Sequence, residues 1–511
     1  MFIIFAAFLV TSANSVSAAT CTVDSLTDSG SGTGGASGAG DLRYCVAQTN
    51  ANPGADTIEF RVSGTISLLT SLPTLSDSVT LSGNRYHPVI DAENRSGVAI
   101  LKIDSPITVT ISDLTVRRGN ANNPDSGGVS VRGGGTLNLD RVTIDNNTTL
   151  AENGGGIFAS GSTLNITNSR IINNHMSAPG SAGGGISVQG GSFTMTATMI
   201  AGNTLPNPSD IGGAGIHLFQ VPSARIENSV VVGNVNGNYG AGIHNNGSNL
   251  KMSNVTVFGN SGGVQAGGVS NVGGTLALRN CSIIGNSVSR FGGGIYNVGN
   301  GATLTIANTI VAGNLAGVQA ADMFNFATVN AAGKNIIQEP VTNSGSINGS
   351  PAISNVDPKM LSIGDFGGGV FSIGLSLDSP ARNGGVNAEA LDTLGAPLTF
   401  DARGPGFPRT SEGTVDIGAF ESTSPGNAFA IEGRVRGGLS IIKARSIVKL
   451  TDVASGNERF AVTSSFGNFR FSGIAFGSVV RVEVMTKEAV FDPRGLVVGG
   501  DIAGLDIRPV L

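Results

Sequence analysis

Hydrophobic and polar residues alternate along much of the chain with a period of two rather than 3.6. The segments 163–166, 275–278 and 303–306 each place an apolar residue at every second position, with polar or small residues between. This alternation is typical of β-strands that bury one face. Glycine or asparagine interrupts it every few residues, so we expect short strands separated by turns and no long helices.

These strands belong to an internal repeat. A glycine-rich signal followed by an aliphatic residue recurs at steps of 28, 29, 30, 27, 26 and 26 residues. Its aliphatic residues are Val129, Ile157, Ile186, Ile216, Ile243, Val269 and Ile295. An asparagine closes each unit, and these are Asn147, Asn174, Asn203, Asn234, Asn260, Asn286 and Asn314. Regular spacing of this kind indicates a stack of similar structural units.

Two columns of the repeat are predicted to face a core. The residue three before each closing asparagine is always Ile or Val. The residue five before it is small or β-branched, and Cys281 fills this place in one unit, so we interpret its thiol as a core filler. One unit cannot bury its apolar face alone, whereas stacked units share a continuous core. The predicted fold is therefore all-β, a parallel β-helix with three strands per coil and about 26–30 residues per coil; the resemblance described below implies that it is right-handed.

The closing asparagines are expected to form a structural ladder. Identical amides stacked about 4.8 Å apart can hydrogen-bond from coil to coil. A second set, six residues before the closing position, is interrupted by Arg141 and Ala197; it comprises Asn168, Asn228, Asn254, Asn280 and Asn308. Asparagine tolerates the left-handed conformation that a sharp corner requires, so we expect these residues at corners.

Composition supports an ordered, extended architecture. The chain has 77 glycines in 511 residues, no tryptophan, 40% hydrophobic and 13% charged residues. Glycine and proline together stay below the fraction typical of disorder, and no Gly-X-Y period suggests collagen. The net charge is −5, without the basic footprint of a nucleic-acid-binding protein. Low charge also suits a stack, because like charges would repel along every column.

The first nineteen residues are interpreted as an export signal. Residues 2–10 form an apolar run that is too short to span a bilayer, and small residues follow up to Ala19. No Lys or Arg precedes the run, so a buried strand is the alternative. Cys21 and Cys45 form a disulfide in an oxidising compartment, or remain unpaired small hydrophobic residues. We expect a secreted or cell-surface protein without a membrane-spanning segment.

The repeat resembles a known class of proteins. The glycine-aliphatic units that end in asparagine look like the coils of right-handed parallel β-helices of the pectin-lyase-like superfamily. Their residue sequence is similar to that of polymorphic outer-membrane-protein repeats. Residues 41–60 (DLRYCVAQTNANPGADTIEF) resemble the entry segment of secreted bacterial members. The resemblance implies residues 20–60 as N-terminal cap and entry segment, followed by β-helix coils over residues 61–345. It implies fold and export more firmly than activity.

Residues 346–421 lose the period and are expected to form the last coils and a C-terminal cap. They resemble the segment called choice-of-anchor Q, through the motifs Asp378-Ser379-Pro380-Ala381, Asp401-Ala402-Arg403-Gly404, Pro408-Arg409 and Asp416-Ile417-Gly418-Ala419-Phe420-Glu421. Where that family has Asp-Ala-Gly, this chain has Arg382-Asn383-Gly384. Asp401, Arg403, Arg409, Asp416 and Glu421 are interpreted as buried ion pairs within the cap, with a catalytic role as the alternative.

A polar linker at residues 422–428 precedes a segment of different composition, residues 429–511. Its alternating strands are divided by glycine- and asparagine-containing turns at sandwich-like spacing. Ile431-Glu432-Gly433-Arg434-Val435 and residues 463–471 (TSSFGNFRF) resemble a carboxypeptidase-regulatory-like domain, a small transthyretin-like antiparallel β-sandwich. The resemblance implies adhesion, spacing or sorting rather than chemistry.

One column is a candidate ligand-binding stripe. The residue after each repeat aliphatic is expected to point outward, and the column reads Phe158, Ser187, His217, His244, Ser270 and Tyr296. Aromatic ends flanking polar groups suit contact with a sugar, and an ordinary solvated face is the alternative. The two histidines have no Asp, Glu or Cys in their column, so we expect neither a metal nor a cofactor.

No catalytic residue is assigned from the sequence. The acids within the coils are scattered, and they are Asp125, Asp140, Asp145, Glu152, Asp210 and Glu227. Asp140 and Glu227 share a column, but three coil steps separate them by roughly 14 Å, beyond the about 5–9.5 Å of a glycosidase pair. The predicted function is therefore non-catalytic adhesion, glycan binding or surface structure, with extracellular glycans or surface components as partners. A polysaccharide lyase or glycoside hydrolase acting along the helix is the alternative.

Overall fold

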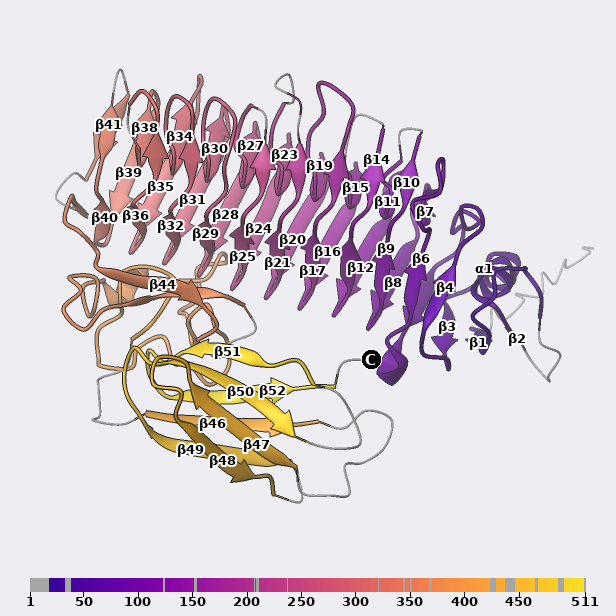
Figure 1. Ribbon diagram of the computed structural model, residues 1–511. Helices are drawn as coiled ribbons and strands as arrows, with labels where there is room; N and C mark the ends of the chain where they lie inside the picture. The colour runs from indigo at the N-terminus through magenta and orange to yellow at the C-terminus, as the bar shows by residue number, and fades with distance from the viewer. Residues whose placement is uncertain are drawn as a thin grey trace, which may run out of the picture.

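A computed structural model describes residues 18–509, apart from 33–37, 123–124, 151–153, 206, 208–210, 237, 320, 343–344, 350–351, 367–369, 423–428, 437–445, 465–466 and 486–490. The apolar run of the expected export signal lies outside the described residues. The chain forms a long parallel β-solenoid, and a small β-sandwich lies beside it (Figure 1). The fold class predicted from the sequence, a right-handed parallel β-helix followed by a small sandwich, is confirmed.

Each coil contributes one strand to each of three parallel sheets, which we call sheets A, B and C. Strands of sheet A are β2 Ala39–Gly40, β1 Thr20–Val23, β3 Asp56–Phe60, β5 Val79–Ser82, β8 Thr108–Ser112, β12 Thr136–Asp140, β16 Thr163–Thr167, β20 Ser192–Thr196, β24 Ser223–Glu227, β28 Asn249–Ser253, β31 Thr275–Arg279, β35 Thr303–Ala307, β39 Thr328–Ala332 and β42 Ser346–Asn348. Strands of sheet B are β4 Thr65–Ser67, β6 Val89–Asp91, β9 Thr115–Arg117, β13 Thr143–Asp145, β17 Arg170–Ile172, β21 Met199–Ala201, β25 Val230–Val232, β29 Thr256–Phe258, β32 Ser282–Ile284, β36 Ile310–Ala312, β40 Asn335–Ile337 and β43 Ile353–Ser354.

Sheet C contains the repeat aliphatic residues. Its strands are β7 Leu101–Ile103, β11 Val129–Val131, β15 Ile157–Ser160, β19 Ile186–Gln189, β23 Ile216–Phe219, β27 Ile243–Asn246, β30 Val269–Val272, β34 Ile295–Val298, β38 Met323–Asn325 and β41 Pro340–Thr342. Two-residue strands follow the closing asparagines and pair separately, and they are β10 Asn120–Ala121, β14 Thr148–Thr149, β18 His175–Met176, β22 Thr204–Leu205, β26 Val235–Asn236, β33 Ser287–Val288 and β37 Leu315–Ala316. Two short 3-10 helices, η1 Asn84–Tyr86 and η3 Asn387–Glu389, lie between strands.

The interior of the solenoid is one continuous apolar core. The residues three before each closing asparagine, such as Ile171 and Val257, are fully buried, as the alternation predicts. The column five before it is buried as well, and Cys281 lies in it. Burial raises the pKa of the Cys281 thiol to about 12, so this thiol is protonated and unreactive near neutral pH.

The corners between sheets A and B adopt left-handed backbone. Asn168, Asn228, Asn254, Asn280 and Asn308 all have φ between 46° and 54°, as we expected for this column. Arg141 and Ala197 interrupt the asparagine pattern but keep the same conformation, with φ of 55° and 49°. The corner is therefore imposed by the coil geometry, and asparagine is the residue that meets it at least cost.

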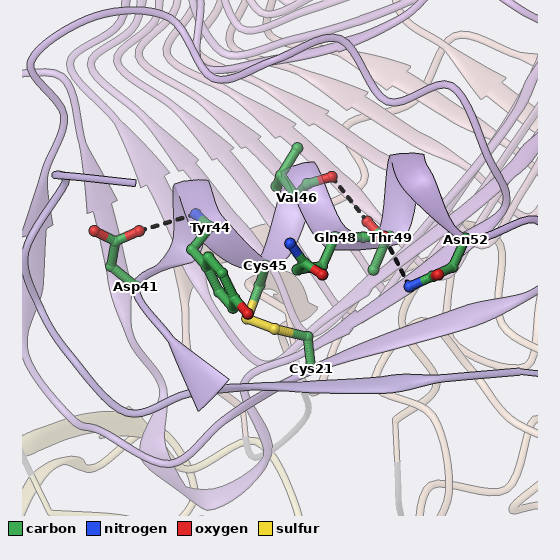
Figure 2. Close-up of a disulfide and its surroundings, with 8 residues drawn as sticks. All are labelled: Cys21, Asp41, Tyr44, Cys45, Val46, Gln48, Thr49 and Asn52. Carbon is green, nitrogen blue, oxygen red and sulfur yellow. Dashed lines mark hydrogen bonds between the residues drawn. A yellow bond between two sulfur atoms is a disulfide. The ribbon is translucent and has the colours of Figure 1, made fainter. Parts of the chain in front are cut away.

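Helix α1 (Leu42–Ala51) lies at the N-terminal end of the solenoid and covers its core with Leu42, Cys45 and Val46. A disulfide joins Cys45 to Cys21 of β1 (Figure 2). Asp41 caps the helix by accepting a hydrogen bond from the Tyr44 amide at 2.9 Å. Burial pushes the pKa of Asp41 up, but hydrogen bonds from Tyr44, Ser29 and Gly30 outweigh it, and the pKa lies below its ordinary value.

The segment after the last coil packs along the side of the solenoid. Its hairpin, β44 (Met360–Gly364) and β45 (Ser372–Leu375), places Ile373 and Leu375 against Ile310 and Ile336 on the outer face of sheet B. We call residues 360–422 the lateral segment. In Figure 1 it runs beneath the last coils and leads into the sandwich.

The sandwich consists of two small sheets that share one core, centred on residues such as Ile431, Val448 and Val482. One sheet contains β49 Asn468–Ile474, β46 Phe429–Val435 and β52 Ile502–Ile507, and the other contains β48 Glu458–Val462, β47 Ile447–Asp452, β50 Val479–Met485 and β51 Arg494–Val497. All pairs are antiparallel except β46 with β52. Strand β52 is therefore an edge strand of the sandwich.

Candidate functional site: the covered column, the ladders and the interdomain cleft

The predicted ligand stripe lies in register but is not exposed. Its residues pair coil to coil on sheet C, and they are Phe158, Ser187, His217, His244, Ser270 and Tyr296. All of them are buried except Tyr296, which is half-buried. The prediction of an exposed stripe is therefore wrong.

The reason is the path of the chain entering each coil. This segment passes over the outer face of sheet C, and its residues Tyr239, Gln265, Phe291 and Gln319 pair with one another from coil to coil. The ring of Tyr239 stacks on His244 at 6.1 Å, and that of Phe291 on Phe324 at 4.7 Å. These covering residues do not follow the alternation, so the pattern of the strands alone did not reveal them.

Beneath this cover, His217 and His244 stack with ring centroids 5.5 Å apart. Burial lowers the pKa of His217 to about 3, with a further contribution from His244, and burial lowers the pKa of His244 to about 4. Both imidazoles are therefore neutral at pH 7. Among the described residues, the Nε2 atom of His217, the Nδ1 atom of His244 and the nearby Ser270 hydroxyl have no hydrogen-bond partner. Two stacked rings with these free nitrogens present no converging ligand set for a metal.

The closing asparagines form a buried ladder. Each Nδ2 donates to the Oδ1 of the next asparagine, as from Asn174 to Asn203 at 3.0 Å and from Asn234 to Asn260 at 2.8 Å. The same Oδ1 also accepts from the preceding asparagine's backbone amide. The whole series, Asn147, Asn174, Asn203, Asn234, Asn260, Asn286 and Asn314, continues to the carboxylate of Asp322, which accepts from Asn314 at 2.8 Å. Each Nδ2 also donates to a backbone carbonyl, as Asn174 does to Ile144, so the amides are engaged within the stack and the ladder has a structural role.

A second buried ladder was missed by sequence reasoning. Asn245, Asn271 and Asn297 each donate to the next asparagine along the stack at 2.7–2.8 Å, and Asn325 is the last acceptor. They occupy an inward position of sheet C where earlier coils carry Ala159, Val188 or Leu218. In the sequence, an asparagine stands two residues after the first residue of the sheet C strand in four successive coils, and this regularity could have predicted the ladder.

The acids of the coils are engaged by neighbouring side chains, and some share a cation with a second carboxylate: Lys102 and Arg132 pair with both Asp104 and Asp125, and Arg141 with both Asp113 and Asp140. Asp140 pairs with Arg141 and accepts from Asn168. Asp125 pairs with Arg132 at 2.5 Å, and Glu227 accepts from the Thr393 amide at 2.9 Å. Asp145 accepts from its neighbours Asn146 and Asn173. Glu152 and Asp210 lie outside the described residues.

Five charged residues of the lateral segment, Asp401, Arg403, Arg409, Asp416 and Glu421, are buried. Arg403 pairs with Asp401 at 2.7 Å, and Nε of Arg409 lies 3.9 Å from Glu421. Burial raises the pKa of Glu421 to about 8 against the opposing charge of Arg409, and burial likewise raises the pKa of Asp416. Arg409 also donates to Asn280 at the corner of a coil, at 3.1 Å. These groups have almost no solvent exposure, and they fasten the lateral segment to the solenoid.

A cleft of about 1040 Å³ lies where the sandwich, the lateral segment and sheet B meet. Five guanidinium groups line it, those of Arg170, Arg403, Arg436, Arg494 and Arg508. Three carboxylates also line it, those of Asp365, Asp492 and Asp506. Phe371 adds a ring that is 41% exposed. Sequence reasoning could not find this cleft, because its walls come from segments more than 300 residues apart.

The comparisons with known proteins address the fold. Residues 127–316 match the family model for a right handed beta helix region. Among solved structures, the crystal structure of pectate lyase Pel9A is similar with a TM-score of 0.41 and 15% identity, covering 79% of this chain and 97% of that chain. No curated protein matches.

Two further observations bear on the candidate site. Within the described part of the chain, no three His, Cys, Asp or Glu side chains gather so as to hold a metal ion. No helix in that part has the length and apolar character needed to cross a membrane.

Proposed function

We propose that this protein is a secreted or cell-surface β-helix protein that binds glycans for adhesion or surface structure and performs no chemistry on them. The observation that carries the proposal is the arrangement of the coil acids. Asp125 pairs with Lys102 and Arg132, and Asp145 accepts from Asn146. Asp140 and Glu227, in contrast, share a column but lie three coils apart and are held by Arg141 and Thr393. Inverting and retaining glycosidases both need two carboxyl groups that flank the glycosidic bond to be cleaved.

Export is supported by two features. The apolar run at residues 2–10 followed by small residues suits a signal peptide. The disulfide between Cys21 and Cys45 suits an oxidising compartment, because such bonds persist mainly outside the cytosol. In the proposal, the solenoid supplies a long rigid body and the sandwich supplies a compact module at its side.

A glycan panel tests the proposal by measuring binding and turnover on the same samples. We expect saturable binding to at least one glycan, with no release of unsaturated or reducing ends over prolonged incubation. Sustained release that scales with protein concentration would contradict the non-catalytic assignment and favour a lyase or hydrolase. Absence of binding across neutral, carboxylated and sulfated glycans would contradict the glycan-binding assignment.

A further inference from the structure

We infer that the cleft between the sandwich and sheet B is a binding site for an anionic glycan, held by arginines on both walls. This inference rests on the proposed function and deepens it by naming a site and a ligand class. It follows from the accessible charge of the cleft, from the open position of Arg170 and from the sharing of one carboxylate by two arginines.

The accessible charge of the cleft is positive although the chain as a whole carries −5. Arg436 and Arg508 are each 52% exposed, Arg494 is 38% exposed and Arg170 is exposed. Asp365, in contrast, is almost fully buried behind Arg494. Four reachable guanidinium groups therefore face two reachable carboxylates, those of Asp492 and Asp506.

Arg170 belongs to the solenoid wall of the cleft. It stands in the outward column of sheet B that continues with Met199 and Val230 in the next two coils. Val370 of the lateral segment packs on Met199 and Val230, further along the same column. Within the described residues Arg170 has no ion pair, so its guanidinium is open to a ligand in the cleft.

On the sandwich wall, Arg436 and Arg508 share a single carboxylate. Nε of Arg436 lies 2.7 Å from Asp506, and Arg508 reaches the same side chain at 3.0 Å. One carboxylate cannot saturate two guanidinium groups, which carry five N–H donors each. The remaining donors are suited to a second, external acid, because guanidinium binds carboxylate or sulfate oxygens in a bidentate manner.

The volume of the cleft and the exposed ring of Phe371 favour a saccharide ligand over a small free anion. The cleft volume is at the upper end of the about 300–1000 Å³ that is typical of ligand pockets. A partly exposed aromatic ring offers the apolar face on which a sugar ring can rest. Carboxylated and sulfated sugars share the required chemistry, so the experiment compares them directly.

The test measures binding of the full-length chain to three oligosaccharides of equal length: a uronate, a sulfated sugar and a neutral glucan. We expect one or both anionic probes to bind and the affinity to fall as salt rises. Arg170→Gln and Arg508→Gln should each weaken binding about tenfold, which corresponds to one lost charge-assisted contact. Arg225→Gln, which removes a cation from β24 on sheet A, should leave the affinity unchanged.

Each other outcome is decisive. Equal affinity of the Arg170→Gln, Arg508→Gln and Arg225→Gln variants would overturn the cleft assignment, even if an anionic glycan binds. Binding of the neutral glucan alone would overturn the anionic class while sustaining the proposed function. Absence of binding to all three probes and to the wider panel would defeat the proposed function itself.

Discussion

The carboxamide of Asn174 occupies the space in which a side chain at Gly156 would lie. A β-carbon at Gly156 would come within 2.8 Å of Cγ of Asn174 and 2.7 Å of the Gly185 carbonyl oxygen. The same approach recurs in the next coil between Gly185 and Asn203, at 2.9 Å. The two most regular signals of the repeat, the glycine and the closing asparagine, are therefore the two sides of one contact across the coil.

Gly156→Ala should lower the free energy of unfolding by about 2 kcal/mol, because both neighbours that the new methyl group meets are held by hydrogen bonds. Urea-induced unfolding measures this change. Gly161→Asn is the matched control on the same coil: its φ of 59° suits asparagine and no atom lies within 4 Å of the added carbon. The control should stay within about 0.5 kcal/mol of the wild type. Equal stability of the two variants would contradict the close contact between Gly156 and Asn174.

Asn234→Asp should lower the free energy of unfolding by about 3–5 kcal/mol. Nδ2 of Asn234 donates to Asn260 and to the Ile200 carbonyl, and a carboxylate would replace these donors with a buried charge. Asn165→Asp is the control, because Asn165 makes a similar amide contact with Asn138 on the half-buried outer face of sheet A. Thermal or urea unfolding should show a loss below about 1 kcal/mol for the control.

As the pH drops from 7 to 5, Glu421, with its pKa raised to about 8, should stabilise the folded chain, whereas His217 and His244 should destabilise it. The folded-state pKa values of the two histidines, about 3 and about 4, lie below the ordinary 6.5, so at these sites the unfolded chain binds more protons in this range. Each histidine should lower the free energy of unfolding by about 2 kcal/mol at pH 5.

The double variant His217→Phe/His244→Phe isolates this effect. Phenylalanine is compatible with the column, because Phe158 and Phe324 occupy it in other coils. Urea unfolding at the two pH values should show about 4 kcal/mol less acid sensitivity in the variant than in the wild type. An unchanged pH dependence would mean that the two imidazoles are accessible to protons in the folded state.

Loss of the disulfide between Cys21 and Cys45 should destabilise the N-terminal end of the solenoid. The bond closes a loop with a sequence separation of 24, for which chain entropy gives about 3 kcal/mol. Cys21→Ser/Cys45→Ser should show this loss in urea unfolding, and reductant should shift the wild type but not the variant. Reductant that shifts both proteins equally would show that the effect does not arise from this bond.

The repeat was predictable from the sequence because each coil places the same residue type at the same corner or core position. Ile171 and Asn174 follow from spacing alone, since their neighbours are their counterparts in adjacent coils. The burial of His217 was not predictable in this way, because the covering segment contributes Tyr239 and Phe291 without a fixed pattern.

The cleft was beyond sequence reasoning for a related reason. Arg170 and Arg508 meet in one cleft only because the lateral segment turns back along the solenoid and carries the sandwich with it. That path depends on contacts between residues that are distant in sequence, such as Arg409 with Asn280 and Ala419 with Ser282. No local sequence pattern predicts contacts between residues so far apart in the chain.

The lateral segment also changes how the stack can come apart. A solenoid held only by nearest-neighbour contacts can fray one coil at a time from either end. Here Thr393 is bonded to Glu227, Phe400 to Asn254, Arg409 to Asn280 and Val386 to Asn308, so one segment ties together four successive coils. Those coils must open together with the segment, which makes the C-terminal half of the solenoid a single cooperative unit and leaves independent fraying to the coils that precede β24.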